Sequence, residues 1–293
     1  MTAPVDFTAC PRVPGRAYNG ANGKKICVAF EGARWMLKFP PPAGERPTAL
    51  SYTNSCLSEH LASSAFRLLG LDAQETRLGT FCNGREKIVC ACRDFTADGR
   101  ILYDFCSVKN TVLKSETGGA GTELSDVLNA IDGQDFVDPV ALRARFWDMF
   151  VADALLGNFD RHNGNWGFLV DPATGAAEPA PVFDCGSCLL PQADEATMRR
   201  VLADPAELDA RIYVFPASML KIGGRKINYA DFLASSDDPD LAAARARIVP
   251  RIDPAAFARL VAETPYLTDL QRAFYTTYFA ARAEKLFHVH PRN

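Results

Sequence analysis

The chain of 293 residues is long enough to bury a substantial core, either as one large domain or as two lobes. Hydrophobic residues make up 48% of it and charged residues 23%, which is typical of a globular protein. The formal net charge of −3 argues against direct binding of nucleic acid, because that function favours a strongly basic face.

The N-terminal segment and the cysteines indicate the compartment. Residues 1–20 contain no long apolar stretch and no basic segment followed by an apolar one, so we expect neither a signal peptide nor a membrane span. The nine cysteines are an odd number and are scattered along the chain, which is typical of reduced thiols in a cytosol. We therefore expect a cytoplasmic protein, or a secreted effector without a cleaved signal peptide.

Two cysteine pairs raise the question of a zinc site. Cys90 with Cys92, and Cys185 with Cys188, would together offer four thiolates. The first pair has only one intervening residue, a poor match to structural zinc sites, and no histidine follows at regular spacing. Buried reduced thiols are the favoured interpretation.

The first predicted element is a hairpin, after an irregular arm over residues 1–17. Tight turns are predicted at Asn19-Gly20 and Asn22-Gly23, because Asn and Gly both tolerate positive φ. A strand over residues 26–30 follows. A glycine turn between two strands can place backbone N–H groups over nucleotide phosphates, so these four turn residues are candidate nucleotide contacts; an ordinary hairpin is the alternative. The sequence GxxxxGK[ST] does not occur, which argues against a P-loop NTPase.

The second hairpin strand is predicted over residues 34–39 and is stopped by Pro40. Within it Lys38 stands between two apolar residues, so strand alternation places its side chain on the opposite face. Kinases keep a phosphate-binding lysine on a strand of this kind. We predict this role for Lys38, with a solvated edge residue as the alternative.

A helix is predicted over residues 54–69 and ends at Gly70. One face of it is an apolar stripe, formed by Leu57, Leu61, Ala65 and Leu68. Glu59 lies roughly opposite that stripe and is the one acidic residue of the helix. We predict that Glu59 forms an ion pair with Lys38 and orients its ammonium group toward the phosphates. A solvent-facing side chain is the alternative.

Two further strands, over residues 76–80 and 87–92, are predicted around a turn at Asn83-Gly84. The chain then leaves the second strand through Cys92, Arg93 and Asp94, where a hinge between lobes would lie. Backbone N–H and C=O groups of these three residues are the candidate contacts to adenine. Such contacts need no particular side chain, so the sequence does not assign them individually.

From about residue 101 the pattern becomes mostly helical. Asp138-Pro139 is a good N-cap and first-turn pair, and it opens a helix that ends at Gly157, just before Asp160. A rigid helix would thus position the loop that carries Asp160. Helical periodicity also predicts helices over residues 195–203, 253–263 and 268–286.

The loop after this helix contains a candidate catalytic set. Asp160 and Asn165 have the spacing of the base Asp and the metal-binding Asn in the protein-kinase catalytic loop. Segments 165–170 and 180–184 are predicted to pair as a hairpin, which would bring Asn165 beside Asp184 at one ion. Turn and cap chemistry is the alternative. His162 is grouped with the catalytic residues, and we expect it to hydrogen-bond within the loop and hold the Asp160 backbone.

The segments around these residues resemble the HipA-like serine/threonine kinases, and most closely the CtkA-type bacterial branch. They are DALLGNFDRHNGNWGF at 153–168 and PVFDCGSCL at 181–189. Nearer the N-terminus, WMLKFP, YTNSCLSEHLA and KIVCACRDF fit the same branch. The resemblance implies an α+β, two-lobed protein-kinase-like fold. A small β-rich N-lobe with one main helix would cover residues 1–95, and a larger, mostly helical C-lobe would cover residues 96–293.

The resemblance also implies a reaction and roles for individual residues. By position, Lys38 contacts the phosphates of ATP, Asp160 is the catalytic base, and Asn165 and Asp184 hold Mg²⁺. The expected function is phosphorylation of Ser or Thr hydroxyls of a protein, including the chain itself. Related loops occur in phosphoinositide kinases, so a lipid or small-molecule phosphotransferase is one alternative. A pseudokinase that acts as an interaction protein is the other.

Overall fold

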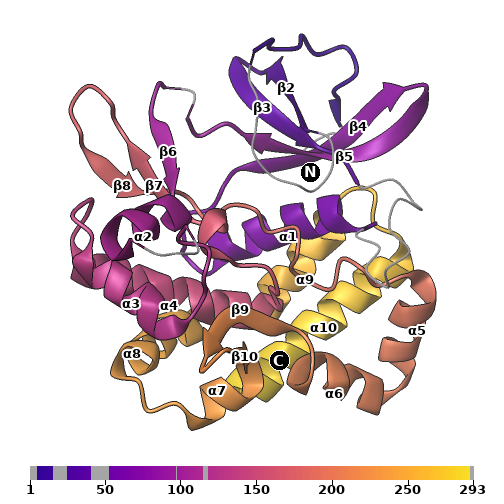
Figure 1. Ribbon diagram of the computed structural model, residues 1–293. Helices are drawn as coiled ribbons and strands as arrows, with labels where there is room; N and C mark the ends of the chain where they lie inside the picture. Colours follow the sequence, from indigo (N-terminus) through magenta and orange to yellow (C-terminus); the bar gives the residue numbers. More distant parts are fainter. Residues whose placement is uncertain (1–4, 16–24, 41–52, 97, 115–117, 291–293) are drawn as a thin grey trace.

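The computed structural model describes residues 5–15, 25–40, 53–96, 98–114 and 118–290 (Figure 1). A five-stranded sheet with one long helix beside it forms a small β-rich lobe, and helices make up most of the rest of the molecule. This arrangement confirms the predicted α+β fold with a β-rich lobe and a helical lobe. The boundary at residues 95 and 96 stays a prediction.

The sheet of the small lobe has the strand order β1-β4-β5-β3-β2. Its strands are β1 (Val5–Asp6), β2 (Lys25–Phe30), β3 (Ala33–Lys38), β4 (Thr76–Asn83) and β5 (Arg85–Arg93). The β2–β3 and β4–β5 hairpins confirm the four predicted strands. The predicted turn residues Asn19, Gly20, Asn22 and Gly23 lie outside the described residues.

The N-terminal arm is not wholly irregular, so the expectation for residues 1–17 is wrong in part. Strand β1 pairs in parallel with β4, with Val5 opposite Gly79. A Cβ atom at Gly79 would lie 2.3 Å from the Val5 carbonyl oxygen and 2.5 Å from the Phe7 ring. A glycine is therefore required where β1 lies against β4.

The predicted helix over residues 54–69 is present as α1 (Ser55–Leu68). Most of its apolar stripe is buried, but Leu68 is 47% exposed, and Leu69 is buried instead. The stripe therefore ends one turn earlier than its periodicity predicts, because the chain leaves the helix at Gly70 with φ of 77°. Glu59 is only 1% exposed, so the alternative of a solvent-facing side chain is wrong.

Nine α-helices are described after the small lobe. They are α2 (Phe105–Leu113), α3 (Leu124–Gly133), α4 (Pro139–Leu156), α5 (Glu195–Ala203), α6 (Pro205–Tyr213), α7 (Tyr229–Ser235), α8 (Pro239–Ile248), α9 (Pro254–Glu263) and α10 (Asp269–Phe287). Short turns of 3-10 helix occur at η1 (Asn163–Asn165) and η2 (Val249–Arg251). The helices predicted over residues 139–156, 195–203, 253–263 and 268–286 are confirmed as α4, α5, α9 and α10.

Helix α4 is the central support of the helical lobe. It packs against α3, α8 and α10, and the Asp138 carboxylate accepts hydrogen bonds from the first-turn N–H groups of Val140 and Ala141. At the other end, the buried Arg282 of α10 donates to the carbonyl oxygens of Ala154 and Leu155, both at 3.0 Å. A cation at these otherwise unsatisfied carbonyls stabilises the helix end from which the next loop emerges.

Five strands interrupt the mostly helical part. A three-stranded sheet has the order β6-β7-β8, and β9 and β10 form a hairpin near α7 (Figure 1). Their bounds are β6 (Ile101–Asp104), β7 (Gly167–Val170), β8 (Ala177–Pro179), β9 (Ala217–Ile222) and β10 (Arg225–Asn228). The sequence predicted β7 and a partner strand, but it did not predict β6, β9 or β10.

The partner strand of β7 was predicted in the wrong place. Residues 177–179 pair with β7, rather than residues 180–184. The turn closes tightly, since Gly175 N–H donates to the Asp171 carbonyl, so the residues directly after the turn reach the ladder first. Val182 instead exchanges hydrogen bonds with the segment before β4, through Asp72 and Gln74.

Within the described residues, no helix is both long and apolar enough to cross a membrane.

Candidate active site

Three charged side chains meet where the two lobes face each other. The Lys38 ammonium, at the end of β3, lies 2.8 Å from Glu59 Oε2 on α1 and 2.9 Å from Asp184 Oδ1 in the loop after β8. The structure therefore brings together three of the residues that the sequence predicted for phosphate and metal binding. It confirms the expected ion pair between Lys38 and Glu59.

The charges of this trio support one another. Burial opposes the charge of Lys38, but Asp184 and Glu59 outweigh it and raise the Lys38 pKa well above its ordinary value. In return, the Lys38 ammonium lowers the pKa of Asp184 to about 2, against the effect of burial. Lys25 also lowers the Asp184 pKa, so two cations keep this carboxylate ionised.

Glu59 holds more than the lysine. Its second oxygen, Oε1, accepts the backbone N–H of Cys185 at 3.1 Å. The neighbouring Asp184 has φ of 55°, in the left-handed region that only Gly, Asn and Asp adopt with ease. One glutamate thus fixes both the β3 lysine and the strained backbone turn that carries Asp184. The link from Glu59 to Cys185 was not predicted, because nothing in the local sequence marks it.

The loop after α4 is held mainly through the backbone of Asp160. Asn158 Oδ1 accepts the Asp160 N–H at 3.0 Å, and the Asp160 carbonyl accepts from His162 N–H at 2.8 Å and from Asn165 Nδ2 at 2.9 Å. The His162 ring caps η1, where Nδ1 accepts the Gly164 N–H at 3.0 Å. His162 therefore hydrogen-bonds within the loop as expected, although its backbone and not its ring contacts Asp160.

Arg161 is a functional residue that the sequence reasoning missed. It is buried beside Asp153, with Nε 3.0 Å from Asp153 Oδ2. Its Nη1 donates to the carbonyl oxygens of Asn165 and Phe183, at 2.9 and 2.5 Å. One guanidinium thus ties the Asp160–Asn165 loop to the residue before Asp184. The sequence does contain a signal for this pair, because Asp153 is an acidic residue in the apolar last turns of α4 and would need a cationic partner when buried.

Because Arg161 bonds to the carbonyl groups of both Asn165 and Phe183, the segments that carry Asn165 and Asp184 lie next to each other. They do so although residues 180–184 do not form the predicted hairpin strand. Burial opposes the charge of Arg161, but Asp153 outweighs it, and the Arg161 pKa lies well above its ordinary value. The guanidinium stays charged, so its bonds to the two carbonyl groups are charge-assisted. The roles of Asn165 and Asp184 in metal binding stay predictions.

Asp160 sits in a mixed electrostatic environment. Burial raises its pKa, and the charge of Asp184 acts in the same direction, while His162, Lys226 and Arg161 partly oppose the rise. A raised pKa makes a carboxylate a better proton acceptor at neutral pH. The environment therefore fits a base, and the assignment of Asp160 as the base stays a prediction.

The predicted hinge residues are mostly engaged by the protein. Arg93 N–H donates to the Glu75 carbonyl at 2.8 Å, and Asp94 N–H donates to the Arg34 carbonyl at 2.9 Å. Cys92 is buried within the β3–β5–β4 ladder. Because the N–H groups of Arg93 and Asp94 already donate within the protein, they are not available to adenine. Adenine contacts at the hinge are therefore predicted only for carbonyl groups and for residues beyond Asp94.

The donor types at the site suit magnesium. The described residues contain no cluster of three or more His, Cys, Asp or Glu side chains that could hold a metal ion, at the cysteine pairs or elsewhere. Magnesium is commonly held by one or two protein oxygens, with phosphate oxygens and waters completing the shell. Asn165 and the ionised Asp184 offer such oxygens, so these residues fit the ion.

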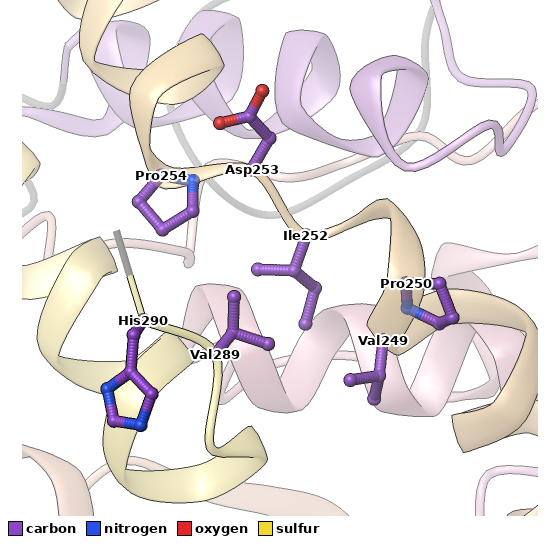
Figure 2. A pocket seen from close by; sticks show the side chains of 7 residues that line it. All are labelled: Val249, Pro250, Ile252, Asp253, Pro254, Val289 and His290. Carbon is purple, nitrogen blue, oxygen red and sulfur yellow. The ribbon is translucent and has the colours of Figure 1, made fainter. Parts of the chain in front are cut away.

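A separate hollow of about 230 Å³ lies between η2, the start of α9 and the end of the described chain (Figure 2). It is lined by Val249, Pro250, Ile252, Asp253, Pro254, Val289 and His290. None of the predicted site residues lines it. The lining is largely apolar, and it provides no set of groups for chemistry.

Comparisons with known proteins agree with this geometry. The family model "HipA-like C-terminal domain" matches residues 17–259. The chain is 47% identical to "Serine/threonine-protein kinase CtkA" of Helicobacter pylori strain J99 over 286 residues, which cover 97% of this chain and 87% of that protein.

Two solved structures are similar in fold. The crystal structure of a Helicobacter pylori proinflammatory kinase CtkA matches with a TM-score of 0.92 and 46% identity, covering 98% of this chain and 96% of the other. HipA of Shewanella oneidensis MR-1, solved with HipB and operator DNA, matches with a TM-score of 0.55 and 18% identity, covering 98% and 74%. The first match confirms the predicted kinase-like fold, and the second shows likeness of fold alone.

Proposed function

The chain belongs to the HipA-like C-terminal domain family and is a serine/threonine protein kinase, and we propose that it uses ATP and Mg²⁺ to phosphorylate Ser or Thr hydroxyls of proteins, its own among them. The observation that carries the proposal is the contact of Lys38 with both Glu59 and Asp184. It joins the β-rich lobe to the loop that follows the Asp160 segment. We divide the lobes near residue 95, with residues 1–95 and 96–293 as the two parts.

Lys38 and its two carboxylate partners form the nucleotide side of the site. The Lys38 ammonium binds phosphate oxygens, and Glu59 fixes its direction while it also holds the Cys185 N–H. Asn165 and Asp184 hold the magnesium ion, which when bound neutralises charge on the phosphates. Asn165 Nδ2 is engaged by the Asp160 carbonyl, so its Oδ1 oxygen is the atom that faces the ion.

Asp160 serves the hydroxyl side of the reaction. Its backbone is fixed by Asn158, His162 and Asn165, which leaves the carboxylate to orient the acceptor hydroxyl and to take its proton. The protein environment that raises the Asp160 pKa helps this transfer. We place the reaction in the cytoplasm, or in a target cell if the chain is a secreted effector, because its described cysteines are free thiols.

Transfer from γ-labelled ATP, followed by mass spectrometry of the chain and of a protein substrate, tests this function. The Asp160→Ala variant should lose about 10²- to 10⁴-fold in transfer rate, the usual contribution of a general base. It should still bind Mg·ATP by calorimetry. Asp135→Ala, on an exposed loop, is the matched control and should retain full activity. Undiminished transfer by the Asp160→Ala variant would refute the assignment.

A further inference from the structure

The β9–β10 hairpin is attached to the catalytic loop at both of its ends. Before β9, the Phe215 ring lies 5.4 Å from the Phe159 ring. After β10, the Tyr229 hydroxyl donates to the Asn158 carbonyl at 2.7 Å. Asn158 and Phe159 directly precede Asp160, so both ends of the hairpin are anchored beside the proposed base.

The tip of the hairpin is held from a second side. The Glu123 carboxylate accepts the N–H groups of Gly223 and Gly224 at 2.5 and 3.1 Å. The segment just before Glu123 is bonded in turn to the catalytic loop, where Asn163 Nδ2 donates to the Gly121 carbonyl at 2.8 Å. The hairpin is therefore held in place at its tip as well as at its two ends.

One face of the β9–β10 hairpin is basic. Lys221 and Lys226 are cross-strand partners, so their side chains lie on the same face of the hairpin. The opposite face is buried, through Ser218, Leu220 and Ile227. Arg225 and Lys226 are exposed, and Lys221 is partly exposed. In a chain of net charge −3, the hairpin is thus a local concentration of positive charge.

Within the described residues, the two lysines form no ion pair that would offset their mutual repulsion. Like charges directly opposite one another destabilise a hairpin. Within the described parts of the chain, neither lysine lies within ion-pair distance of a carboxylate, and Lys226 Nζ lies 3.2 Å from the Met219 sulfur. The nearby Glu123 carboxylate is directed at backbone amides. The two ammonium groups are therefore free to bind an anionic group from outside the chain.

The anchors of the hairpin place it next to the proposed base. Phe215, before β9, contacts Phe159, and Tyr229, after β10, bonds to Asn158, so both contacts are made to the two residues that precede Asp160. A group bound at the lysine pair would therefore lie on an element that is anchored beside the reacting centre.

We propose that Lys221 and Lys226 form a specificity site that binds an acidic side chain of the protein substrate, a few residues from the acceptor Ser or Thr. The inference rests on the kinase function proposed above and names the substrate class for that same site. A carboxylate or a phosphorylated side chain would each satisfy the paired ammonium groups. Neither lysine takes part in the chemical step.

A matched peptide series tests this site. Each peptide has a central Ser, and one flanking position at a time carries Asp, phosphoserine, Asn or Lys. The unaltered protein should phosphorylate the best Asp peptide with a kcat/KM about three- to tenfold above its Asn counterpart, as expected for one or two partly exposed ion pairs. The phosphoserine arm tells whether the site takes a carboxylate or a previously phosphorylated substrate. The gain should shrink at high salt.

Variants separate recognition from a structural role. Lys221→Ala with Lys226→Ala should remove the preference through KM, so that the ratio of kcat/KM between the Asp and Asn peptides falls to about one, while the KM for ATP stays within about twofold. Lys226→Glu should shift the preference toward the Lys peptide. Lys87→Ala, an exposed lysine on β5, is the control and should keep the acidic preference.

The outcomes are distinct. An acidic preference that survives the double substitution, no preference in the unaltered protein, or an equal loss on Asp and Asn peptides would each overturn the specificity site and leave the kinase function standing. Failure of the unaltered protein to phosphorylate any peptide or itself would overturn the proposed function, and the specificity site with it.

Discussion

The buried Arg161–Asp153 pair provides the sharpest test of how the site is held together. Replacing Arg161 by Met keeps much of the side-chain volume but leaves the Asp153 carboxylate, with 2% of its side chain exposed, without its cation. Removing one partner of a buried ion pair costs about 3–5 kcal/mol. The two carbonyl groups that lose Arg161 add to this, while Asn158 Nδ2 at 2.7 Å still satisfies part of Asp153.

We therefore expect Arg161→Met to lower the free energy of unfolding by about 3–5 kcal/mol, a large share of the usual stability of a domain. Urea denaturation followed by circular dichroism measures the change. The matched control is Arg199→Met, because Arg199 makes an exposed pair with Glu195, with side chains 69% and 73% exposed, and its loss should change stability by less than about 0.5 kcal/mol.

A double-mutant cycle shows whether the buried charge is the cause. Asp153→Asn with Arg161→Met should be less destabilised than the sum of the two single changes, because the double variant has no unpaired buried charge. If Arg161→Met unfolds at the same urea midpoint as the Arg199 control, the proposed role of the pair is refuted. If the single changes are additive, the pair does not act as a unit.

Three further predictions concern the charged trio and the sheet. Glu59→Gln should weaken the orientation of Lys38 and lower kcat/KM for ATP by about 10²-fold, measured by steady-state transfer, whereas a purely structural glutamate would lower thermal stability without this kinetic change. Since the folded pKa of Asp184 is about 2 and its ordinary value is 3.8, its stabilising contribution is present above about pH 4 and is lost as the pH falls through 2. That loss should be no more than about 1 kcal/mol, because the side chain is 42% exposed and screened, and it should be missing in acid titrations of Asp184→Asn. Gly79→Ala should lower the free energy of unfolding by about 1–3 kcal/mol through its clash with the Val5 carbonyl. An unchanged melting temperature would contradict the close approach of β1 to β4 at this residue.

Local signals in the sequence were sufficient for several elements and for part of the site. Helix α4 was predicted with its true ends, because Asp138, Pro139 and Gly157 are cap residues whose effect does not depend on distant parts of the chain. The Asp160-to-Asn165 spacing predicted a kinase-like catalytic loop for the same reason, and the roles of these two residues stay predictions. The pairing of Lys38 with Glu59 joins two neighbouring elements of the chain, and alternation and helical periodicity predicted the faces they occupy.

Contacts between distant segments were decided by the tertiary structure alone. The predicted hairpin after Asn165 placed its second strand too late, because the tightness of the turn and the pairing of Val182 with the segment before β4 set the register. The bonds of Arg161 to Phe183 and of Glu59 to Cys185 likewise depend on which polar groups are buried together.

The sequence by itself determined the helices with strong caps and the faces on which Lys38 and Glu59 lie, since each follows from periodicity or capping. The tertiary structure decided how Asp184 is held and that the ends of the basic β9–β10 hairpin are anchored at Asn158 and Phe159. The physical reason is that these contacts gain their free energy from burial and charge brought together across long separations. A single sequence carries no local mark of such neighbours.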